Sequence, residues 1–595
     1  MSGYLMLTSI PIDKKIGIYH LKTGGQRSIN YSDGSEVRLI KIIQSAKDRS
    51  SSSMELESSI IDWPTKYHLS NLRTNVIRAL NFIKKDSEVL EIGAGCGALT
   101  RYLGEQFKSV DAIEGSFQRA FIIKERCKDL NNVKVYCCAL QDLIFDKGYD
   151  VVTLIGVLEY APIFYYPTAN TSDDACLEMV KHAMTALKDD GYLIIAIENK
   201  FGLKYWSGCT EDHTGRIFDS IHGYPQGNSV ITFSRNEIIR LLQKAGLNYL
   251  EFYYPFPDYK LTNTVLREVH NPNEYYLHNW IKVPFEDYSQ NRRYYFNEAL
   301  AIKSLVKAGM IYDFSNSFLV VGSKTKTPSD NAMEQHWIAK RFSTNRILPF
   351  RTVTVLERED KVHSLVIRKR KLFDVNDIDL PIRLLASDSK WIPGDLLLYS
   401  LCEAIYKEAR RENILNVVAR YHSELIKRFC LDKSDSEGYP LVNPEAIDYV
   451  PSNIVSKDEG LYGIDHEWVY TRPISADYIL FRALFQFGFE QYPYIFRDSY
   501  KTGNMDTFIL WIISSIYPKY DTRRQGLNKS LEEELQSIVS GKPIRLPPLD
   551  EFGIYKDPIL QKEAQINSML NSWSWRITAP LRSIYRHIVK IMNLL

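Results

Sequence analysis

Short apolar segments alternate with longer amphipathic ones between Ser87 and about Lys324. The apolar segments have the length of buried strands, and roughly 10 to 15 residues with helical apolar spacing separate them. Buried strands separated by helices are typical of a parallel sheet covered on both faces. The pattern therefore predicts a doubly wound, Rossmann-like α/β domain over residues 86–325. Its strands are predicted in SEVLEIG, KSVDAIE, NVKVYCCA, YDVVTLIG, GYLIIAIE, NYLEFYYPF and SFLVVGSK.

Residues 1–85 precede this domain and follow a different pattern. They contain a predicted strand pair around a Gly-Gly turn (IGIYHLKTGGQRSINY), a polar linker at residues 50–53 and a predicted helix over residues 71–84. We expect this N-terminal segment to be a hairpin and a helix that lead into the sheet.

A second unit is predicted over residues 331–550. It begins with strand-like segments, RTVTVLERE and KVHSLVIRKRKL, and becomes helical from about residue 394, apart from a strand-rich part at residues 446–470. A small β-rich lobe followed by a larger α-rich lobe is a two-lobed α+β arrangement. The tail, residues 560–595, is separate from both units.

Composition and charge exclude several classes of protein. The chain has 595 residues, of which 45% are hydrophobic and 25% charged, as in folded globular proteins. Its 74 basic and 72 acidic residues leave a charge of +2, so we expect no binding to nucleic acid through a general positive field. Eight cysteines without CxxC spacing suit a reducing cytoplasm. The longest apolar stretch, residues 508–517, is about half of what a membrane-spanning helix needs, so we expect none.

The first chemical site is predicted at the end of the first buried strand. There the sequence EIGAGCG places Gly93, Gly95 and Gly97 before a helix, where unpaired N–H groups and close backbone approach favour a bound ligand. Glu114 ends the next strand and offers oxygens for ribose hydroxyls. Glu91 separates the ligand classes, because its carboxylate would repel a pyrophosphate and attract the ammonium of S-adenosylmethionine. A dinucleotide site and a glycine turn without a ligand are the alternatives.

These residues resemble the class I S-adenosylmethionine-dependent methyltransferases over about residues 60–325. VLEIGAGCGALTRYL is similar to their first motif, and IGVLEYA to the segment that lines the methyl-transfer site. The resemblance implies that the three glycines admit the methionine end and that Glu91 contacts its amino group. It also implies that Glu114 binds the ribose and that Gln141 and Asp142 contact the adenine edge. DWPTKYHLSNLRTN, IENKFGLKYWSG, EDHTG, TFSRNEI and YPFPDYKL resemble bacterial surface-polysaccharide members of this family.

Methyl transfer from a sulfonium is an in-line displacement, so the protein mainly aligns the reactants. A base is needed only when the acceptor must lose a proton. Candidates near the expected mouth of the site are Tyr67, His68, Asp212, His213 and Asp258. Each is alternatively a loop or packing residue. An anionic phosphate acceptor would need no base, and a nearby Arg or Lys would bind it instead.

A second chemical site is predicted in AIDYVPSNIVSKDEGLYGIDHEW. Asp448, Asn453 and Asp465 supply an acid to orient a hydroxyl group and two ligands for magnesium, as phosphoryl transfer requires. DYVPSNIV resembles the catalytic loop of protein-kinase-like and aminoglycoside-phosphotransferase-like enzymes, and IDHEW their DFG segment. The resemblance implies that Lys369 is the small-lobe lysine that binds ATP. Ala446 replaces the catalytic-loop histidine and no GxGxxG loop is present, so an inactive scaffold or ligand-binding unit and an unrelated fold are the alternatives.

The tail combines apolar and basic residues. PLRSIYRHIVKIMNLL predicts an amphipathic helix, with Arg582, Arg586 and Lys590 beside its apolar face. Such a helix suits an anionic membrane interface, and docking on the protein itself or on a partner is the alternative. SWSWRITAPLR resembles the ends of bacterial polysaccharide glycosyltransferases.

Together these features predict a methyltransferase that acts on a bacterial surface glycan or a lipid-linked saccharide at the inner face of the cytoplasmic membrane. The pairing of domains resembles the bifunctional kinase-methyltransferases that cap O-antigen chains, which implies S-adenosylmethionine, ATP and Mg²⁺ as cofactors. A methyltransferase with an inactive kinase-like scaffold that recruits glycosyltransferases is the first alternative. A nicotinamide-dependent enzyme is the second.

Overall fold

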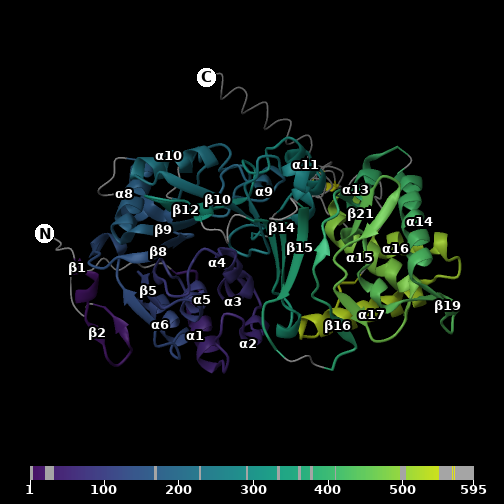
Figure 1. The fold of residues 1–595 in the computed structure, drawn as a ribbon, viewed down its shortest axis with the longest axis horizontal. Coiled ribbons are helices and arrows are strands. Elements are labelled where there is room, and N and C mark those ends of the chain that lie inside the picture. Colours follow the sequence, from purple (N-terminus) through teal and green to yellow (C-terminus); the bar gives the residue numbers. More distant parts are fainter. Residues whose placement is uncertain are drawn as a thin grey trace, which may run out of the picture.

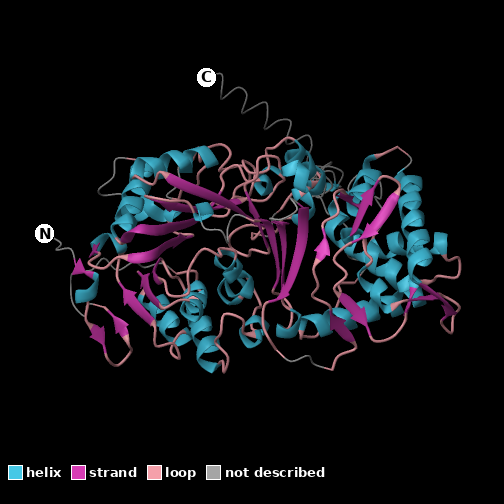
Figure 2. Ribbon diagram, in the orientation of Figure 1, coloured by secondary structure: helices cyan, strands magenta, loops and turns pink. Residues whose placement is uncertain are grey.

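The computed structural model describes most of the chain: residues 5–20, 32–165, 171–226, 230–289, 292–330, 336–359, 364–375, 379–408, 410–495 and 504–548, and residues 566, 568 and 569. Within them a sheet of 14 strands runs from the N-terminal segment through the predicted methyltransferase domain into the second unit. Figure 1 shows this arrangement, with helices α13 to α17 gathered beyond the far end of the sheet, and Figure 2 shows the strands passing from one unit to the next. In spatial order the strands are β17 (Ser389–Lys390), β15 (Ser364–Lys371), β14 (Thr352–Glu359), β13 (Trp337–Ser343), β11 (Thr264–Arg267), β10 (Tyr249–Phe256), β12 (Ser317–Ser323), β9 (Leu187–Glu198), β8 (Tyr149–Ile155), β4 (Glu88–Ile92), β5 (Ser109–Glu114), β6 (Val133–Cys137), β3 (Ile18–Tyr19) and β2 (Ile12–Asp13).

The central strands confirm the α/β prediction, with one correction. Strands β6, β5, β4, β8 and β9 are parallel neighbours, as the alternating pattern predicts. Strand β12 runs antiparallel to both β9 and β10, so the sheet is mixed and not wholly parallel. An apolar run reads the same in both directions, and the pattern therefore contained no information on this reversal.

Helices cover both faces of the sheet. Val89 belongs to a buried cluster that includes residues of α4, α5 and α6, whereas Leu90 belongs to another that includes residues of α8 and α10, as expected for alternate residues of a buried strand. The helices around this part are α1 (Glu36–Ser45), α2 (Met54–Ser58), α3 (Trp63–Leu69), α4 (Asn75–Arg78), α5 (Ala98–Gln106), α6 (Phe117–Arg126), α7 (Ala161–Tyr165), α8 (Ser172–Thr185), α9 (Leu203–Trp206), α10 (Arg235–Ala245) and α11 (Glu298–Lys307).

The helix predicted over residues 71–84 is shorter than the pattern indicated. A 3-10 turn, Asn71–Thr74, leads into α4, which ends at Arg78. The Lys340 ammonium group donates a hydrogen bond of 2.5 Å to the carbonyl oxygen of Ala79. A longer helix would need that carbonyl for its own next turn, so a contact from a distant strand accompanies the end of this helix.

The second unit has the predicted order of strands followed by helices. Strands β13, β14 and β15 form antiparallel pairs, and β13 also pairs with β11, so no break in the sheet separates the two units near residue 330. The helices are α13 (Leu397–Tyr406), α14 (Arg410–Phe429), α15 (Ala476–Ile495), α16 (Met505–Ile516) and α17 (Thr522–Ser540). Short strands lie between them, including β21 (Ile454–Lys457), β22 (Gly460–Gly463) and β23 (Trp468–Tyr470).

Two predicted features fall outside the described part of the chain. These are the Gly-Gly turn of the N-terminal hairpin, within residues 21–31, and nearly all of the tail over residues 560–595. None of the helices that the structure describes is both long enough and apolar enough to cross a bilayer.

Candidate active site

The glycine turn lies between β4 and α5, where the sequence predicts it. Gly93, Gly95 and Gly97 have φ angles of +72°, +57° and +77°, in the left-handed region that favours glycine. A Cβ on Gly93 would also lie 2.5 Å from a methyl carbon of Val157. The turn therefore needs glycine for its own backbone, as well as for the access of a ligand.

Glu114, at the end of β5, fixes this turn from the neighbouring strand. Its Oε2 accepts a hydrogen bond of 2.8 Å from the Gly95 N–H, and its Oε1 accepts one of 2.9 Å from the Ser116 N–H. Burial raises the pKa of Glu114. Each carboxylate oxygen has a second lone pair, so Glu114 retains the capacity to accept hydrogen bonds from a ribose.

Glu91 lies at the bottom of the same site. It is only 4% exposed, and its Oε2 has no hydrogen-bond partner among the described residues. Burial raises the pKa of Glu91 to about 8. A buried carboxylate oxygen without a partner is a suitable acceptor for the ammonium group of a methyl donor.

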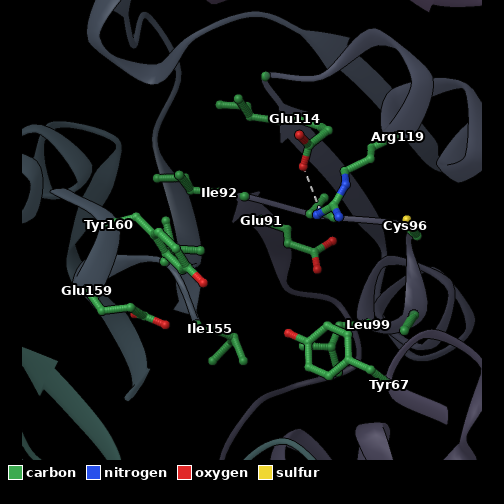
Figure 3. A pocket seen from close by; sticks show the side chains of 18 of the residues that line it. Tyr67, Glu91, Ile92, Cys96, Leu99, Glu114, Arg119, Ile155, Glu159 and Tyr160 are labelled. Atoms are coloured by element: carbon green, nitrogen blue, oxygen red, sulfur yellow. Dashed lines mark hydrogen bonds between the residues drawn. The ribbon is translucent and has the colours of Figure 1, made fainter. Parts of the chain in front are cut away.

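These residues line one cavity of about 340 Å³. Figure 3 shows Glu91 and Glu114 on one side and Glu159 and Tyr160 across from them. Gln141, which follows β6, also lines this cavity. Asp142, its neighbour, is not among the lining residues, although its buried Oδ2 lacks a hydrogen-bond partner within the described residues.

Four of the five predicted catalytic candidates line the cavity. Tyr67, His68, Asp212 and His213 line it, and Asp258 lies directly behind, with its Oδ2 accepting a hydrogen bond of 2.6 Å from a lining residue, Tyr288. The structure therefore places all five candidates at the cavity or directly next to it.

His68 is held by a buried contact with Asp33. Its Nε2 lies 2.9 Å from Oδ2 of Asp33, and the side chain is 3% exposed. Burial lowers the pKa of His68, although Asp33 opposes this shift. Arg119 donates a hydrogen bond of 3.0 Å to the same Asp33 oxygen. This pairing makes His68 a support for the cavity wall in the ligand-free structure.

Asp212 belongs to a buried charged network that sequence reasoning missed. We call Glu198, Lys204, Asp212, Asp258 and Lys260 the acceptor-side network. The Oδ2 of Asp212 lies 2.7 Å from the Lys204 ammonium and 2.5 Å from that of Lys260, which in turn lies 2.5 Å from Glu198. The segments IENKFGLKYWSG, EDHTG and YPFPDYKL contain all five residues. The signal in the sequence that could have indicated this network is the charged residues near the ends of strands.

His213 adjoins this network. Its Nε2 lies 3.6 Å from Glu198, and its Nδ1 lies 3.4 Å from the Tyr160 hydroxyl group. Burial alone would lower the pKa of His213, but the Glu198 carboxylate raises it to about 9. Glu159 lies on the same wall, where burial and the nearby Glu198 raise its pKa to about 8.

The second predicted site is also assembled in space. Lys369 lies on β15, and its ammonium contacts Asp465 and lies 2.8 Å from Glu467. Burial opposes charge on Lys369, but Asp465 and Glu467 raise its pKa. Arg346, from the connection between β13 and β14, also binds Glu467, at 2.5 Å. Glu467 is a member of this site that the sequence did not single out.

Asp448 and Asn453 lie beside this group. The Asp448 Oδ2 accepts hydrogen bonds of 2.8 and 2.7 Å from the N–H groups of Glu467 and Trp468. The Asn453 amide donates one of 3.2 Å to the Asp448 carbonyl oxygen. Burial, with the nearby Glu467, raises the pKa of Asp448 to about 7. Asp448 thus holds the segment that follows Asp465, and its Oδ1 remains available.

One family model matches part of the first unit. Residues 66–251 match a family model described as a methyltransferase domain. This match spans the glycine turn, Glu114, Asp212 and His213.

Part of the first unit is therefore similar to a methyltransferase domain.

Solved structures similar to the chain include several methyltransferases. One, described as a possible histamine N-methyltransferase from Thermotoga maritima, is 17% identical, with 43% of this chain and 91% of that chain covered and a TM-score of 0.25. Another is magnesium protoporphyrin IX methyltransferase from Synechocystis with bound S-adenosylhomocysteine, at 12% identity, 49% and 95% coverage and a TM-score of 0.27. A third is phosphoethanolamine N-methyltransferase 1 from Haemonchus contortus, at 20% identity, 38% and 45% coverage and a TM-score of 0.24. No curated protein matches the chain.

Proposed function

We propose that this protein transfers the methyl group of S-adenosylmethionine to an oxygen atom at the end of a bacterial surface glycan. The oxygen belongs to a sugar hydroxyl or to a phosphate on the terminal sugar. The observation that carries the proposal is the single cavity in which the glycine turn and Glu91 meet the acceptor-side network. The resemblance of segments in this domain to bacterial surface-polysaccharide methyltransferases supports the class of acceptor.

The far wall of the cavity is suited to an oxygen acceptor. In the reaction the acceptor oxygen attacks the methyl carbon while the sulfur keeps the electrons of the broken S–C bond. Lys260 and Arg73 line the cavity, and either cation would bind a phosphate oxygen, which carries no proton to remove. For a sugar hydroxyl, the Asp212 carboxylate, which lines the cavity, is the candidate to receive the proton.

A second activity, phosphoryl transfer to the acceptor sugar, is supported by the contact between Lys369 and Asp465. The two residues are 96 positions apart, and this pairing is what a lysine for ATP phosphates and an acid for Mg²⁺ require. In this scheme Asn453 and Asp465 hold Mg²⁺, Lys369 binds ATP, and the free Oδ1 of Asp448 orients the sugar hydroxyl. Phosphorylation would create the group that is then methylated.

The alternative is a methyltransferase whose second unit binds and does not transfer phosphate. This unit would recruit glycosyltransferases, and the basic tail over residues 560–595 would hold the protein on the inner face of the cytoplasmic membrane. The same tail serves the first proposal, since a lipid-linked acceptor lies at that surface.

One experiment separates these proposals. The full chain is incubated with methyl-labelled S-adenosylmethionine and a synthetic oligosaccharide, with and without a terminal phosphate, in the presence or absence of ATP and Mg²⁺. We expect label on the phosphorylated oligosaccharide in all conditions, and on the unphosphorylated one only with ATP and Mg²⁺. Asp465→Ala should abolish the ATP-dependent labelling of the unphosphorylated oligosaccharide and leave the labelling of the phosphorylated one unchanged. Label on the unphosphorylated substrate without ATP supports the scaffold alternative, and no label on either substrate refutes the glycan proposal.

A further inference from the structure

Three potential metal ligands meet at the far wall of the methyltransferase cavity. Glu159 lies just after β8, Glu198 ends β9, and His213 lies in the following connection. One ligand atom from each lies within 4.8 Å of the other two. The glutamates are at most 1% exposed, and the His213 side chain is 9% exposed. The three side chains are therefore close together and almost fully shielded from solvent.

Each of these side chains has an unsatisfied atom. Oε2 of Glu159 and Oε2 of Glu198 make no hydrogen bond to any described residue, and Nε2 of His213 has only the more distant Glu198 Oε1, at 3.6 Å. The other oxygen of each glutamate has a partner, because the Tyr259 hydroxyl lies 3.4 Å from Glu159 Oε1 and 3.3 Å from Glu198 Oε1. Buried polar atoms normally have partners at hydrogen-bond distance, and the lack of such partners for all three atoms in one place indicates a missing ligand.

The charges around these atoms indicate that the ligand is a cation. Four carboxylates lie here, those of Glu159 and of the three acids of the acceptor-side network, and the described residues place two ammonium groups among them, those of Lys204 and Lys260. With all four carboxylates ionised and His213 neutral, as a metal ligand must be, two negative charges remain without a matching lysine. One divalent cation balances them, and one proton each on Glu159 and His213 is the competing solution.

We propose that Glu159, Glu198 and His213 bind one divalent metal ion of the Zn²⁺ or Mn²⁺ class beside the methyl donor. Two carboxylates and one imidazole form a three-ligand set of the kind that leaves a coordination position open. Ligand atoms around such an ion lie about 3.4 Å apart, so small side-chain rotations would complete the site. The Lys260 ammonium lies on Oε1 of Glu198 and leaves Oε2 for the metal.

The open position gives the metal a role in the proposed function, on which this inference rests. Glu159 and His213 line the cavity, so the open position faces the acceptor. There the ion would bind the acceptor oxygen and lower the pKa of a bound hydroxyl, whose proton passes to solvent. The oxygen then forms the bond to the methyl carbon as the S–C bond breaks, and the sulfur keeps the electron pair.

The test is a metal titration of the full chain after chelator treatment. Mn²⁺ binding is followed by electron paramagnetic resonance of free Mn²⁺ and Zn²⁺ binding by calorimetry, without nucleotide and in an Asp465→Asn background that disables the second proposed metal site. We expect one ion per chain and at least tenfold weaker binding in Glu159→Gln and in Glu198→Gln. Glu251→Gln is the control, because this glutamate on β10 is hydrogen-bonded to Arg267 and Ser329, away from the cavity.

Folding of each variant is checked by its binding of S-adenosylmethionine. The inference is overturned if the parent binds no ion, or if folded Glu159→Gln and Glu198→Gln bind it as the parent does. These results are independent of the glycan. An ion that binds as expected with no methylation of any glycan would refute only the proposed acceptor, whereas full methylation by a metal-free chain would refute only the metal site.

Discussion

Substitution of Gly95 by alanine tests the cofactor site at a single atom. Gly95 lines the cavity, and a Cβ built on it would have no heavy atom within 4 Å. The protein itself therefore has room for this methyl group. A methyl donor bound against the turn would leave no room for it, because glycine is needed where a ligand approaches the backbone closely.

The expected effect has two parts. The φ angle of +57° places Gly95 in the left-handed region, where alanine costs about 1–2 kcal/mol of stability. Displacing the donor from Glu91 would lose a hydrogen bond between charged groups, worth about 1.5–3 kcal/mol, or a Kd roughly 10- to 150-fold higher. Gly309 provides a matched control, because its φ angle is +72° and its Cβ position is equally open, but it follows α11, outside the cavity.

Calorimetric titration with S-adenosylmethionine and thermal unfolding without ligand measure the two parts separately. Gly95→Ala and Gly309→Ala should unfold at similarly lowered temperatures, and only Gly95→Ala should bind the donor more weakly. The reasoning is refuted if Gly95→Ala binds with the parent Kd, or if Gly309→Ala loses as much affinity.

Three further predictions concern charged groups. Glu91, with its pKa raised to about 8, is mainly protonated at pH 7, and an ammonium ligand would favour its ionised form. Binding of the methyl donor should therefore release close to one proton. The calorimetric binding enthalpy of the parent should then differ between phosphate and Tris buffers, whereas that of Glu91→Gln should not. Equal enthalpies in the parent would contradict this. Lys369→Met should weaken the binding of Mg-ATP, measured by fluorescence titration. Lys371 is an exposed lysine on the same strand, and Lys371→Met should leave the affinity unchanged. Equal affinities in both variants would count against the second site. The native state holds the Asp448 proton up to about pH 7, whereas the unfolded chain loses it near pH 4. The contribution of this group to the free energy of unfolding should therefore decline between pH 4 and pH 7. Urea unfolding at pH 5 and 7.5 measures the decline, and Asp448→Asn should remove the part that is due to this group. An unchanged difference between the two pH values would argue against this titration.

The cofactor half of the site was predictable because its signals are local in the sequence. Gly93, Gly95 and Gly97 follow one strand directly, and Glu114 ends the next strand, so parallel strand order alone brings them together. The spacing of Asp448, Asn453 and Asp465 likewise indicated residues that lie near one another in the structure, but their role stays a prediction.

The acceptor half was only partly predictable because long-range packing creates it. Asp212 and His213 were singled out as possible bases, but their partners Lys204, Glu198 and Lys260 come from separate segments whose meeting no spacing encodes. The reversed direction of β12 and the early end of α4 have similar causes, since both depend on elements far along the chain.

Competition binding tests the central claim most directly. Equilibrium dialysis of the full chain with labelled S-adenosylmethionine measures how much donor is bound and which unlabelled compound displaces it. We predict one donor per chain, displaced by S-adenosylhomocysteine and not by NAD. Absence of binding, or displacement by NAD at similar concentrations, would contradict the assignment of the glycine turn, Glu91 and Glu114 to a methyl donor.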